Sequence, residues 1–595
     1  MCGVLWPGKM DFQIVTQVLR DQLGHLLMTV SEEKDLVIDG ELTKPFDRFA
    51  GISFLKQHGV EKIFKLDPTQ KVIHGSERRI YIVRAKMVMM KVIADQINAE
   101  LNRGDKRLYT IVLVPRKLEL CEMILECEGV LGYVTIEELP LDLIPLDTDL
   151  MSLELPDFFT SFYIDEDYTW IHTVASSLVN LENFFGIIPD VFCVGKGSKM
   201  VYELMESMRG LSGTPHPADS KSQIGQLILV DRNVDYVTPL CTPMTYEALL
   251  DERFKIECSI INFGQEVTGK TQDVKQLLTS QDEVYRVIRD RHFSNVFTYL
   301  SSKTKELQTG YDKKKDLKTV GDMKNFVSND LKDLKQQHRT LTYHIGACEA
   351  IMKKKKSEDF EEYIKAEHSV LEGIETKENL TYIEDSLCKQ VSSSSPLKLL
   401  CLLSLTQGGL VSSTYKSITN QFLQSKGYEH MVDLYQLKRT GLLEEQTTSQ
   451  TPGKPKSLPG IAKPSQFRTL AKKLNLIPKS PDDINLRSPN DMSYVFSGAY
   501  TPLLCKVVEQ ILERGGLAGM EEIIKLLPGG IIRHDKTRPN GSKSKSDTVL
   551  VYFLGGCTFS EIAALRYLVR QFSRKVVIAT TAIMTGDSFL KSVLQ

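Results

Sequence analysis

The stretch LILVD at residues 227–231 decides the fold class, because it is an uninterrupted apolar run that ends in a carboxylate. Such a run predicts a parallel β-strand that is buried on both faces. A similar run, VFCV, lies at residues 191–194, but the pattern then disappears for a long stretch of chain. It returns in VLVYFL at 549–554 and in KVVIAT at 575–580. Neither pair of strands can form a fully covered sheet alone, so we predict one α/β domain that a large insertion splits.

The first part of the chain has an α/β pattern of its own. Apolar runs at residues 35–38, 79–83 and 108–114 alternate with helical periods. This alternation indicates parallel strands with helices on both faces. The stretch LPLDLIPLD at 139–147 interrupts the pattern, so we expect a domain boundary close to it.

These patterns predict three domains with doubly wound parallel sheets and a large, mostly helical insertion. The first α/β domain is expected at residues 1–150, and the second, discontinuous one at 151–258 and 481–595. The insertion is expected at 259–480. Residues 445–466, which are rich in Thr, Ser, Pro and Lys, are predicted to be a flexible linker.

The insertion contains an unusually long helical pattern. Apolar residues recur at steps of three and four from Met323 to Met352. The run Lys353, Lys354, Lys355 and Lys356 is expected to turn the chain into a returning helix at 360–371. We therefore predict an αα-hairpin at about residues 318–373.

Composition narrows the class of protein. The chain has 595 residues, of which 42% are hydrophobic and 25% charged, which is typical of a folded globular protein. Its formal net charge is −2, whereas nucleic-acid binders normally carry a basic excess, so no nucleic-acid partner is expected. No segment approaches the ~20 consecutive apolar residues of a membrane-spanning helix. Eleven cysteines without a C-x-x-C pair indicate a reducing compartment, which predicts a cytosolic protein with at most a peripheral membrane role.

The stretch GQEVTGKT at residues 264–271 matches the phosphate-binding loop pattern G-x-x-x-x-G-K-[ST]. The residues that would bind a nucleotide are Gly264, Gly269, Lys270 and Thr271. The segment before the motif alternates polar and apolar residues, as an exposed edge strand does, and no apolar strand ending in Asp follows to hold a metal ion. The motif therefore fits a polar loop better, and nucleotide binding is kept as the alternative.

Two further groups of residues are predicted to be structural. Gly555 and Gly556 follow an apolar strand, and Thr558 with Glu561 forms the capping-box pattern of a helix start. Asp231 and Asp235 flank Arg232, which predicts a salt-bridge network rather than an acid/base pair or a metal site. The chain lacks G-x-S-x-G, H-E-x-x-H and metal-ligand spacings of His or Cys, so no catalytic residues, metal or cofactor are predicted.

Several long strings resemble the Sec-1/Munc-18-like (SM) family of membrane-fusion regulators. They are LVDRNVDYVTPL at 229–240, TYEALLD at 245–251, YVFSGAYTPL at 494–503 and FLGGCTFSEI at 553–562. Their order and spacing fit the family over nearly the whole chain. The strings HFSNVF at 292–297 and HIGACEAIMKKK at 344–355 are similar to those of the vacuolar-sorting members.

The resemblance implies a three-domain arch without enzyme activity and a hairpin that binds SNARE helices. Its partners would be SNARE proteins and the α-solenoid subunit of the vacuolar-sorting 16B type (VIPAR-like). The location implied is cytoplasmic and peripheral on late endosome, lysosome and recycling endosome membranes. The candidate SNARE-binding residues are Met323, Phe326, Lys332, Lys335, Lys353, Lys354, Lys355 and Lys356. Two alternatives remain, a nucleotide-dependent switch and a scaffold that no longer binds SNAREs.

Overall fold

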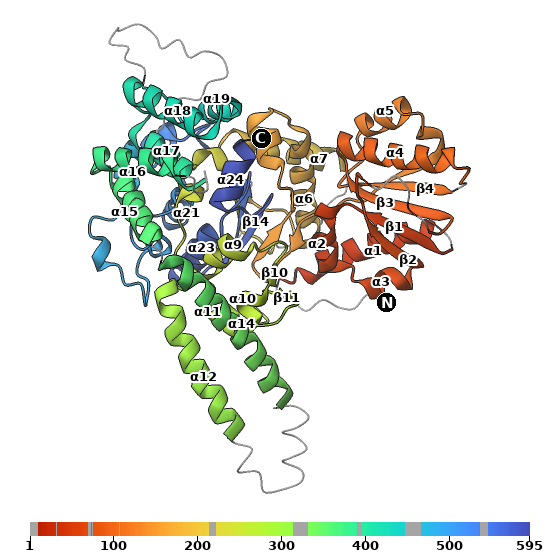
Figure 1. The fold of residues 1–595 in the computed structure, drawn as a ribbon, viewed down its shortest axis with the longest axis horizontal. Coiled ribbons are helices and arrows are strands. Elements are labelled where there is room, and N and C mark those ends of the chain that lie inside the picture. Colours follow the sequence, from red (N-terminus) through yellow and green to blue (C-terminus); the bar gives the residue numbers. More distant parts are fainter. Residues whose placement is uncertain are drawn as a thin grey trace, which may run out of the picture. The chain divides into compact units, whose positions relative to one another are not determined.

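The computed structural model describes residues 10–30, 32–69, 73, 75–105, 107–212, 222–312, 331–356, 358–389, 394–446, 466–535 and 546–594 (Figure 1). The chain divides into two compact units. Unit 1 consists of Met1–Glu154, Ile171–Phe185 and Leu204–His216. Unit 2 consists of Leu155–Trp170, Gly186–Glu203 and Pro217–Gln595.

Unit 1 contains a parallel sheet with the strand order β2-β1-β3-β4-β5. Its strands are β1 (Lys34–Ile38), β2 (Val60–Lys65), β3 (Arg78–Arg84), β4 (Leu108–Val114) and β5 (Val134–Glu138). The predicted strands at 35–38, 79–83 and 108–114 are confirmed. The edge strand β2 was not predicted, because VEKIFK is mostly exposed and has no apolar run.

The helices of unit 1 pack on this sheet. The first five are α1 (Gln13–Thr29), α2 (Gly40–Phe49), α3 (Ile52–Gln57), α4 (Met87–Asn102) and α5 (Glu119–Cys127). Buried residues of α4 and α5, such as Ile93, Ile97 and Leu125, share one core with Tyr81 and Ile111 of the sheet. The short strands β6 (Ile144–Pro145) and β7 (Leu150–Ser152) pair with each other, and α6 (Thr169–Phe185) belongs mainly to unit 1.

In unit 2, strands from distant parts of the sequence lie side by side. The order is β12-β8-β9-β13-β14, with β8 (Asp190–Val194), β9 (Gln226–Asp231), β12 (Ile531–Asp535), β13 (Thr548–Leu554) and β14 (Lys575–Thr580). Leu550 of β13 is in parallel register with Leu227 of β9. The prediction that the two pairs of strands share one sheet is therefore confirmed. Strand β12, which runs antiparallel to β8, was not predicted.

Helices accompany this sheet in the sequence. They are α7 (Lys196–Ser212), α8 (Val237–Leu240), α9 (Tyr246–Phe254), α21 (Leu503–Arg514), α22 (Glu521–Leu526), α23 (Phe559–Phe572) and α24 (Gly586–Val593). Helix α7 is shared by the two units.

The segment between β9 and β12 is mostly helical, as predicted. Among the described residues, its helices between α9 and α21 are α10 (Gln265–Thr268), α11 (Glu283–Ile288), α12 (Val296–Asp312), α14 (Leu331–Lys355), α15 (Glu358–Glu372), α16 (Thr376–Cys388), α17 (Ser394–Gln407), α18 (Ser412–Lys426), α19 (Met431–Arg439) and α20 (Phe467–Leu474). The antiparallel strands β10 (Ile260–Phe263) and β11 (Val274–Leu277) lie on either side of α10 in the sequence and pair with each other. The boundaries at 150, 258 and 480 remain predictions, and most of the predicted linker lies outside the described residues.

Candidate functional site

Two long helices, α12 and α14, run antiparallel and extend together from the rest of unit 2 (Figure 1). Val296, Leu300 and Leu307 on α12 are buried, as is Leu341 on α14. The chain that joins the far ends of the two helices, residues 313–330, lies outside the described residues. We call α12 and α14 the hairpin.

This pairing corrects the predicted hairpin at 318–373. The predicted partner of α14 was the helix that follows it, but α15 packs mainly against α16 and α17. The partner of α14 is instead the helix that precedes it, because α12 presents its own buried apolar positions. The turn expected at Lys353–Lys356 is therefore at the body end of α14 and not at the tip of the hairpin.

The candidate SNARE-binding residues are consequently not brought together by the described structure. Met323 and Phe326 lie outside the described residues, and so does the side chain of Lys332. Lys335 is exposed on α14. These assignments remain predictions.

The four lysines at the end of α14 have two different environments. Lys353, Lys354 and Lys356 are exposed. Lys355 is partly buried, with its ammonium nitrogen 5.1 Å from the ring centroid of Phe293 and 5.7 Å from that of Phe360. Burial lowers its pKa. Lys355 therefore fixes the end of α14 to the body, whereas Lys354 lies near Glu252 and Asp587.

The body end of α14 is also held by a buried histidine. His344 Nδ1 lies 2.9 Å from the hydroxyl oxygen of Tyr246, and Nε2 lies 3.3 Å from a carboxylate oxygen of Asp282. Asp282 also accepts N–H groups of Val284 and Tyr285 at the start of α11. Although burial raises the pKa of Asp282, these hydrogen bonds lower it overall. The hairpin is thus attached through α9 and α11 to the rest of unit 2.

The GQEVTGKT stretch does not have the geometry of a phosphate-binding loop. It lies between the antiparallel strands β10 and β11, and the four-residue helix α10 ends at Gly269, which has φ +66°. In a phosphate-binding loop a helix begins at the G-K-[ST] residues and directs its N–H groups at the phosphate. Here β11 follows instead, and Lys270 is exposed beyond the carboxyl end of α10. The structure thus favours the polar-loop interpretation.

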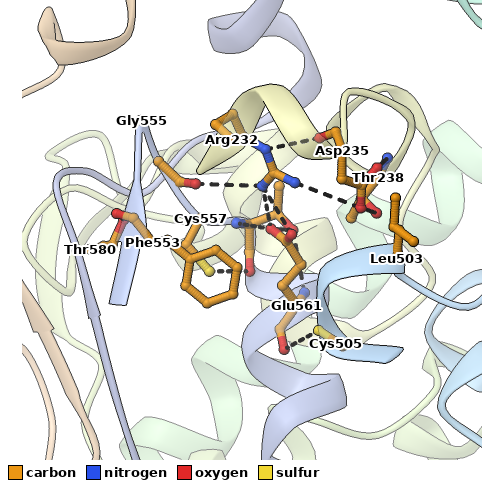
Figure 2. Close-up of polar contacts among 12 residues, drawn as sticks. Arg232, Asp235, Thr238, Leu503, Cys505, Phe553, Gly555, Cys557, Glu561 and Thr580 are labelled. Carbon is orange, nitrogen blue, oxygen red and sulfur yellow. Dashed lines mark hydrogen bonds and ion pairs between the residues drawn. The ribbon is translucent and has the colours of Figure 1, made fainter. Parts of the chain in front are cut away.

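Arg232 is the centre of a fully buried polar network (Figure 2). Its Nη1 donates to both carboxylate oxygens of Glu561 at 2.9 Å, and its Nε donates to the carbonyl oxygen of Asp235 at 3.0 Å. The carboxylate of Asp235 in turn accepts the N–H groups of Val237 and Thr238 at the start of α8. The network joins the segment after β9 to α23, so its role is structural.

Asp231 does not belong to this ion-pair network, which corrects the sequence interpretation. Its carboxylate accepts the N–H groups of Gly197 at 2.6 Å and Ser198 at 2.8 Å, at the start of α7. Burial raises the pKa of Asp231 to about 6. Being next to Arg232 in the sequence did not make the two side chains partners, because Arg232 is oriented toward α23.

The predicted capping box and glycine turn are both present. Thr558 accepts the N–H of Glu561, and the Glu561 carboxylate accepts the N–H of Thr558. Gly555 and Gly556 have φ values of +92° and +109°. A Cβ atom on Gly556 would lie 2.1 Å from the terminal methyl of Met584. The positive φ values favour glycine at both positions, and a side chain at Gly556 would also have to displace the flexible end of Met584.

Sequence reasoning missed an exposed apolar face on α19 and the short helix before it. Tyr428, Met431, Val432 and Tyr435 are between 56% and 69% exposed. Their spacing of three, one and three residues places them on one side of a helix, opposite the buried Leu434 and Leu437. The spacing was visible in the sequence, but it normally indicates burial. We call these four residues the α19 face.

The described residues contain no group of His, Cys, Asp and Glu side chains arranged to hold a metal ion. Within the same residues, no helix combines the length and the apolar character that a membrane span requires.

Comparison with known proteins supplies a family. The model of the Sec1 family matches residues 34–592. Vacuolar protein sorting-associated protein 33B of Homo sapiens is 41% identical, covering 98% of both chains. Vacuolar protein sorting-associated protein 33A of Rattus norvegicus is 34% identical, covering 100% of both chains.

Solved structures support the fold. The Unc18–syntaxin 1 complex from Monosiga brevicollis contains a chain that matches with a TM-score of 0.58 at 18% identity, covering 97% of this chain and 99% of that one. The SM protein Vps45, in complex with the Qa SNARE Tlg2, matches with a TM-score of 0.57 at 14% identity, covering 98% of both chains. The expected α/β class with a helical insertion is confirmed.

Proposed function

The chain belongs to the Sec1 family, and from this premise we propose that it is a non-enzymatic, SNARE-binding regulator of vesicle tethering and fusion in endosomal and lysosomal transport. The observation that carries the proposal is the hairpin, a pair of long helices that extends from unit 2 (Figure 1). SM proteins of the same fold have been solved with syntaxin 1 and with the Qa SNARE Tlg2.

The hairpin suits this task physically. SNARE segments are disordered alone and must form a helical bundle in register, which costs conformational entropy. A surface that holds two segments side by side makes their first contact effectively intramolecular and lowers that cost. The exposed flank of α14 offers Lys335, Lys353 and Lys356 to acidic helices, while His344 and Lys355 hold its base.

We propose that the α19 face is the docking surface for an α-solenoid partner of the vacuolar-sorting 16B type. Four large apolar side chains on consecutive helical turns exceed the scattered exposure expected of an ordinary surface. Two of the four are tyrosines, which are enriched at the energetic centres of interfaces. Recruitment through such a partner would place the protein peripherally on late endosomal, lysosomal and recycling endosomal membranes.

The test measures the two kinds of binding separately. Residues 305–336 of the hairpin are replaced by a short Gly/Ser linker, which keeps Val296, Leu300 and the buried end of α14. SNARE-helix binding should be lost while binding of the solenoid partner is retained. Unchanged SNARE binding would instead favour a scaffold that no longer binds SNAREs.

The nucleotide-dependent switch is disfavoured by the geometry of GQEVTGKT. Titration of the purified protein with labelled ATP and GTP tests it directly. Saturable binding that Lys270→Ala abolishes would restore this alternative.

A further inference from the structure

Unit 2 contains a cavity of about 230 Å³ at the body end of the hairpin. Its walls come from α9, the last turn of α14, the three helices α15, α16 and α17, and the first turn of α24. This volume is below the range of about 300–1000 Å³ that is typical of drug-sized ligands, so the cavity suits a smaller molecule. No part of the proposed function uses this cavity.

One wall of the cavity is aromatic. Phe360 and Tyr363 from α15 and Tyr382 from α16 line it, next to aliphatic side chains of α16 and α17. Such a wall suits the apolar part of a ligand, and an aromatic ring in that ligand would bind more tightly because it can stack on these rings.

The other wall carries paired and unpaired charges. Lys398, whose side chain is only 12% exposed, forms an ion pair of 2.9 Å with Asp587 at the start of α24. The carboxylate of Glu252 also lines the cavity, but among the described residues it has no hydrogen-bond or ion-pair partner. Burial raises the pKa of Glu252, whereas the nearby Lys398 and Lys354 ammonium groups lower it. A partly buried carboxylate without a hydrogen-bond donor is costly, and a ligand cation would remove that cost.

Lys398 can also donate a hydrogen bond to a ligand. An ammonium group has three N–H donors, and Asp587 accepts one of them. The lining as a whole has three lysines and three acidic residues, so it does not favour a net anion or a net cation. A ligand that carries an ammonium group and a carboxylate group on the same carbon atom matches this wall.

We propose that the cavity binds a small zwitterion with an apolar side chain, that is, an α-amino acid. Its ammonium group lies at Glu252, its carboxylate accepts an N–H of Lys398, and its side chain lies against Phe360, Tyr363 and Tyr382. Because the last turn of α14 and the start of α15 form part of the wall, the bound ligand contacts the base of the hairpin.

The test is calorimetric titration of the full chain with L-phenylalanine, N-acetyl-L-phenylalanine and L-phenylalanine amide. The two derivatives each lack one charge, so they should bind about tenfold or more weakly than the amino acid, which corresponds to the loss of one charged hydrogen bond. No binding of L-phenylalanine at millimolar concentration would overturn the proposal. Equal binding of the amide would also overturn it, because the site would then recognise only an ammonium group, such as a peptide N-terminus.

Two variants locate the site. Glu252→Gln and Lys398→Met should each weaken L-phenylalanine binding about tenfold or more, whereas Glu361→Gln on the exposed side of α15 should not change it. Glu252→Gln breaks no hydrogen bond or direct ion pair among the described residues, so the variant should still fold, with a melting temperature close to that of the wild type. Binding that neither variant alters would place the ligand elsewhere and overturn the assignment.

Discussion

Gly346 of α14 packs directly on the backbone of Val267 in α10. A Cβ atom at Gly346 would lie 2.5 Å from the carbonyl oxygen of Val267, which is closer than any real Cβ contact. Because of this close approach, α14 packs against α10, which lies between β10 and β11. Tyr343, Ala347 and Cys348 on α14 are buried. The GQEVTGKT stretch therefore supports the base of the hairpin.

The first prediction concerns this contact. Gly346→Val should lower the free energy of unfolding by about 2–3 kcal/mol, because the side chain must displace backbone atoms rather than a flexible side chain. Urea unfolding measures the loss, and hydrogen exchange should show faster exchange in α14. Gly210→Ala, at a helical glycine of α7 with open space around it, is the matched control and should be neutral or slightly stabilising. If Gly346→Val were as harmless as Gly210→Ala, the contact with Val267 would not restrict the side chain at this position.

The second prediction concerns Gly556. Gly556→Val places a β-branched side chain at φ +109° and also requires the end of Met584 to move, so we expect a loss of about 2–3 kcal/mol, measured as a fall in melting temperature. Gly104→Ala separates the two causes, because Gly104 has φ +85° but open space around it. That change should cost only about 1–2 kcal/mol. A Gly556→Val protein that melts with the wild type would contradict the packing described here.

The third prediction concerns the buried network of Figure 2. Arg232→Met leaves the carboxylate of Glu561 buried without its cation and should cost about 3–5 kcal/mol. Arg232→Met combined with Glu561→Gln should recover part of the loss, since the amide oxygen can still accept the N–H of Thr558.

This variant should also depend on pH. Burial already raises the pKa of Glu561, and removal of Arg232 raises it further. A carboxyl group whose pKa is raised in the folded state stabilises that state at low pH, and this stabilisation is lost as pH rises. The stability deficit of Arg232→Met should therefore be smaller at pH 5 than at pH 8. A deficit that does not change with pH would show that Glu561 does not titrate in the folded protein.

The fourth prediction uses Glu367, which is buried and accepts the N–H and hydroxyl of Thr242. Burial raises its pKa from 4.5 to about 7. The stability that it contributes is therefore present below about pH 4.5 and is lost as pH rises through about 7. Glu367→Gln keeps an acceptor for Thr242 but cannot titrate. The free energy of unfolding, measured with urea between pH 4.5 and 8, should therefore change by about 2–3 kcal/mol less in the variant than in the wild type. An unchanged slope would assign the pH dependence to other groups, such as Asp251, whose pKa burial raises to about 7.

Elements could be predicted from the sequence where the pattern of apolar and polar residues directly indicates which residues are buried. Strands β9 and β13 were found because a strand covered on both faces has an apolar run. Strand β2 was missed because an edge strand has no such run. The capping box at Thr558 was found because its hydrogen bonds span only three residues.

Contacts between distant segments could not be predicted in the same way. The partner of α14 was assigned to the wrong helix, because the lysine run resembled a turn and α12 has few apolar positions. Asp231 was assigned to Arg232 by proximity, whereas its donors lie 33 and 34 residues away in the sequence. The α19 face was missed because its spacing is the same for a buried and an exposed helix, and only the packing of α19 distinguishes them.

The fifth prediction tests the α19 face as the docking surface. Val432→Asp places a charge at a position that is 57% exposed, so the isolated protein should unfold with a free energy within about 0.5 kcal/mol of the wild type. In a complex, the same carboxylate would be buried against the solenoid partner without a counter-charge, and affinity should fall at least about a hundredfold. Surface plasmon resonance with the immobilised solenoid measures the loss, and SNARE-helix binding to the hairpin should be unchanged. Gln424→Asp adds the same charge at an exposed position of α18 and should leave both affinities intact. If Val432→Asp binds the solenoid as tightly as Gln424→Asp does, the partner docks on another surface of unit 2, and the exposed apolar face must have a different occupant.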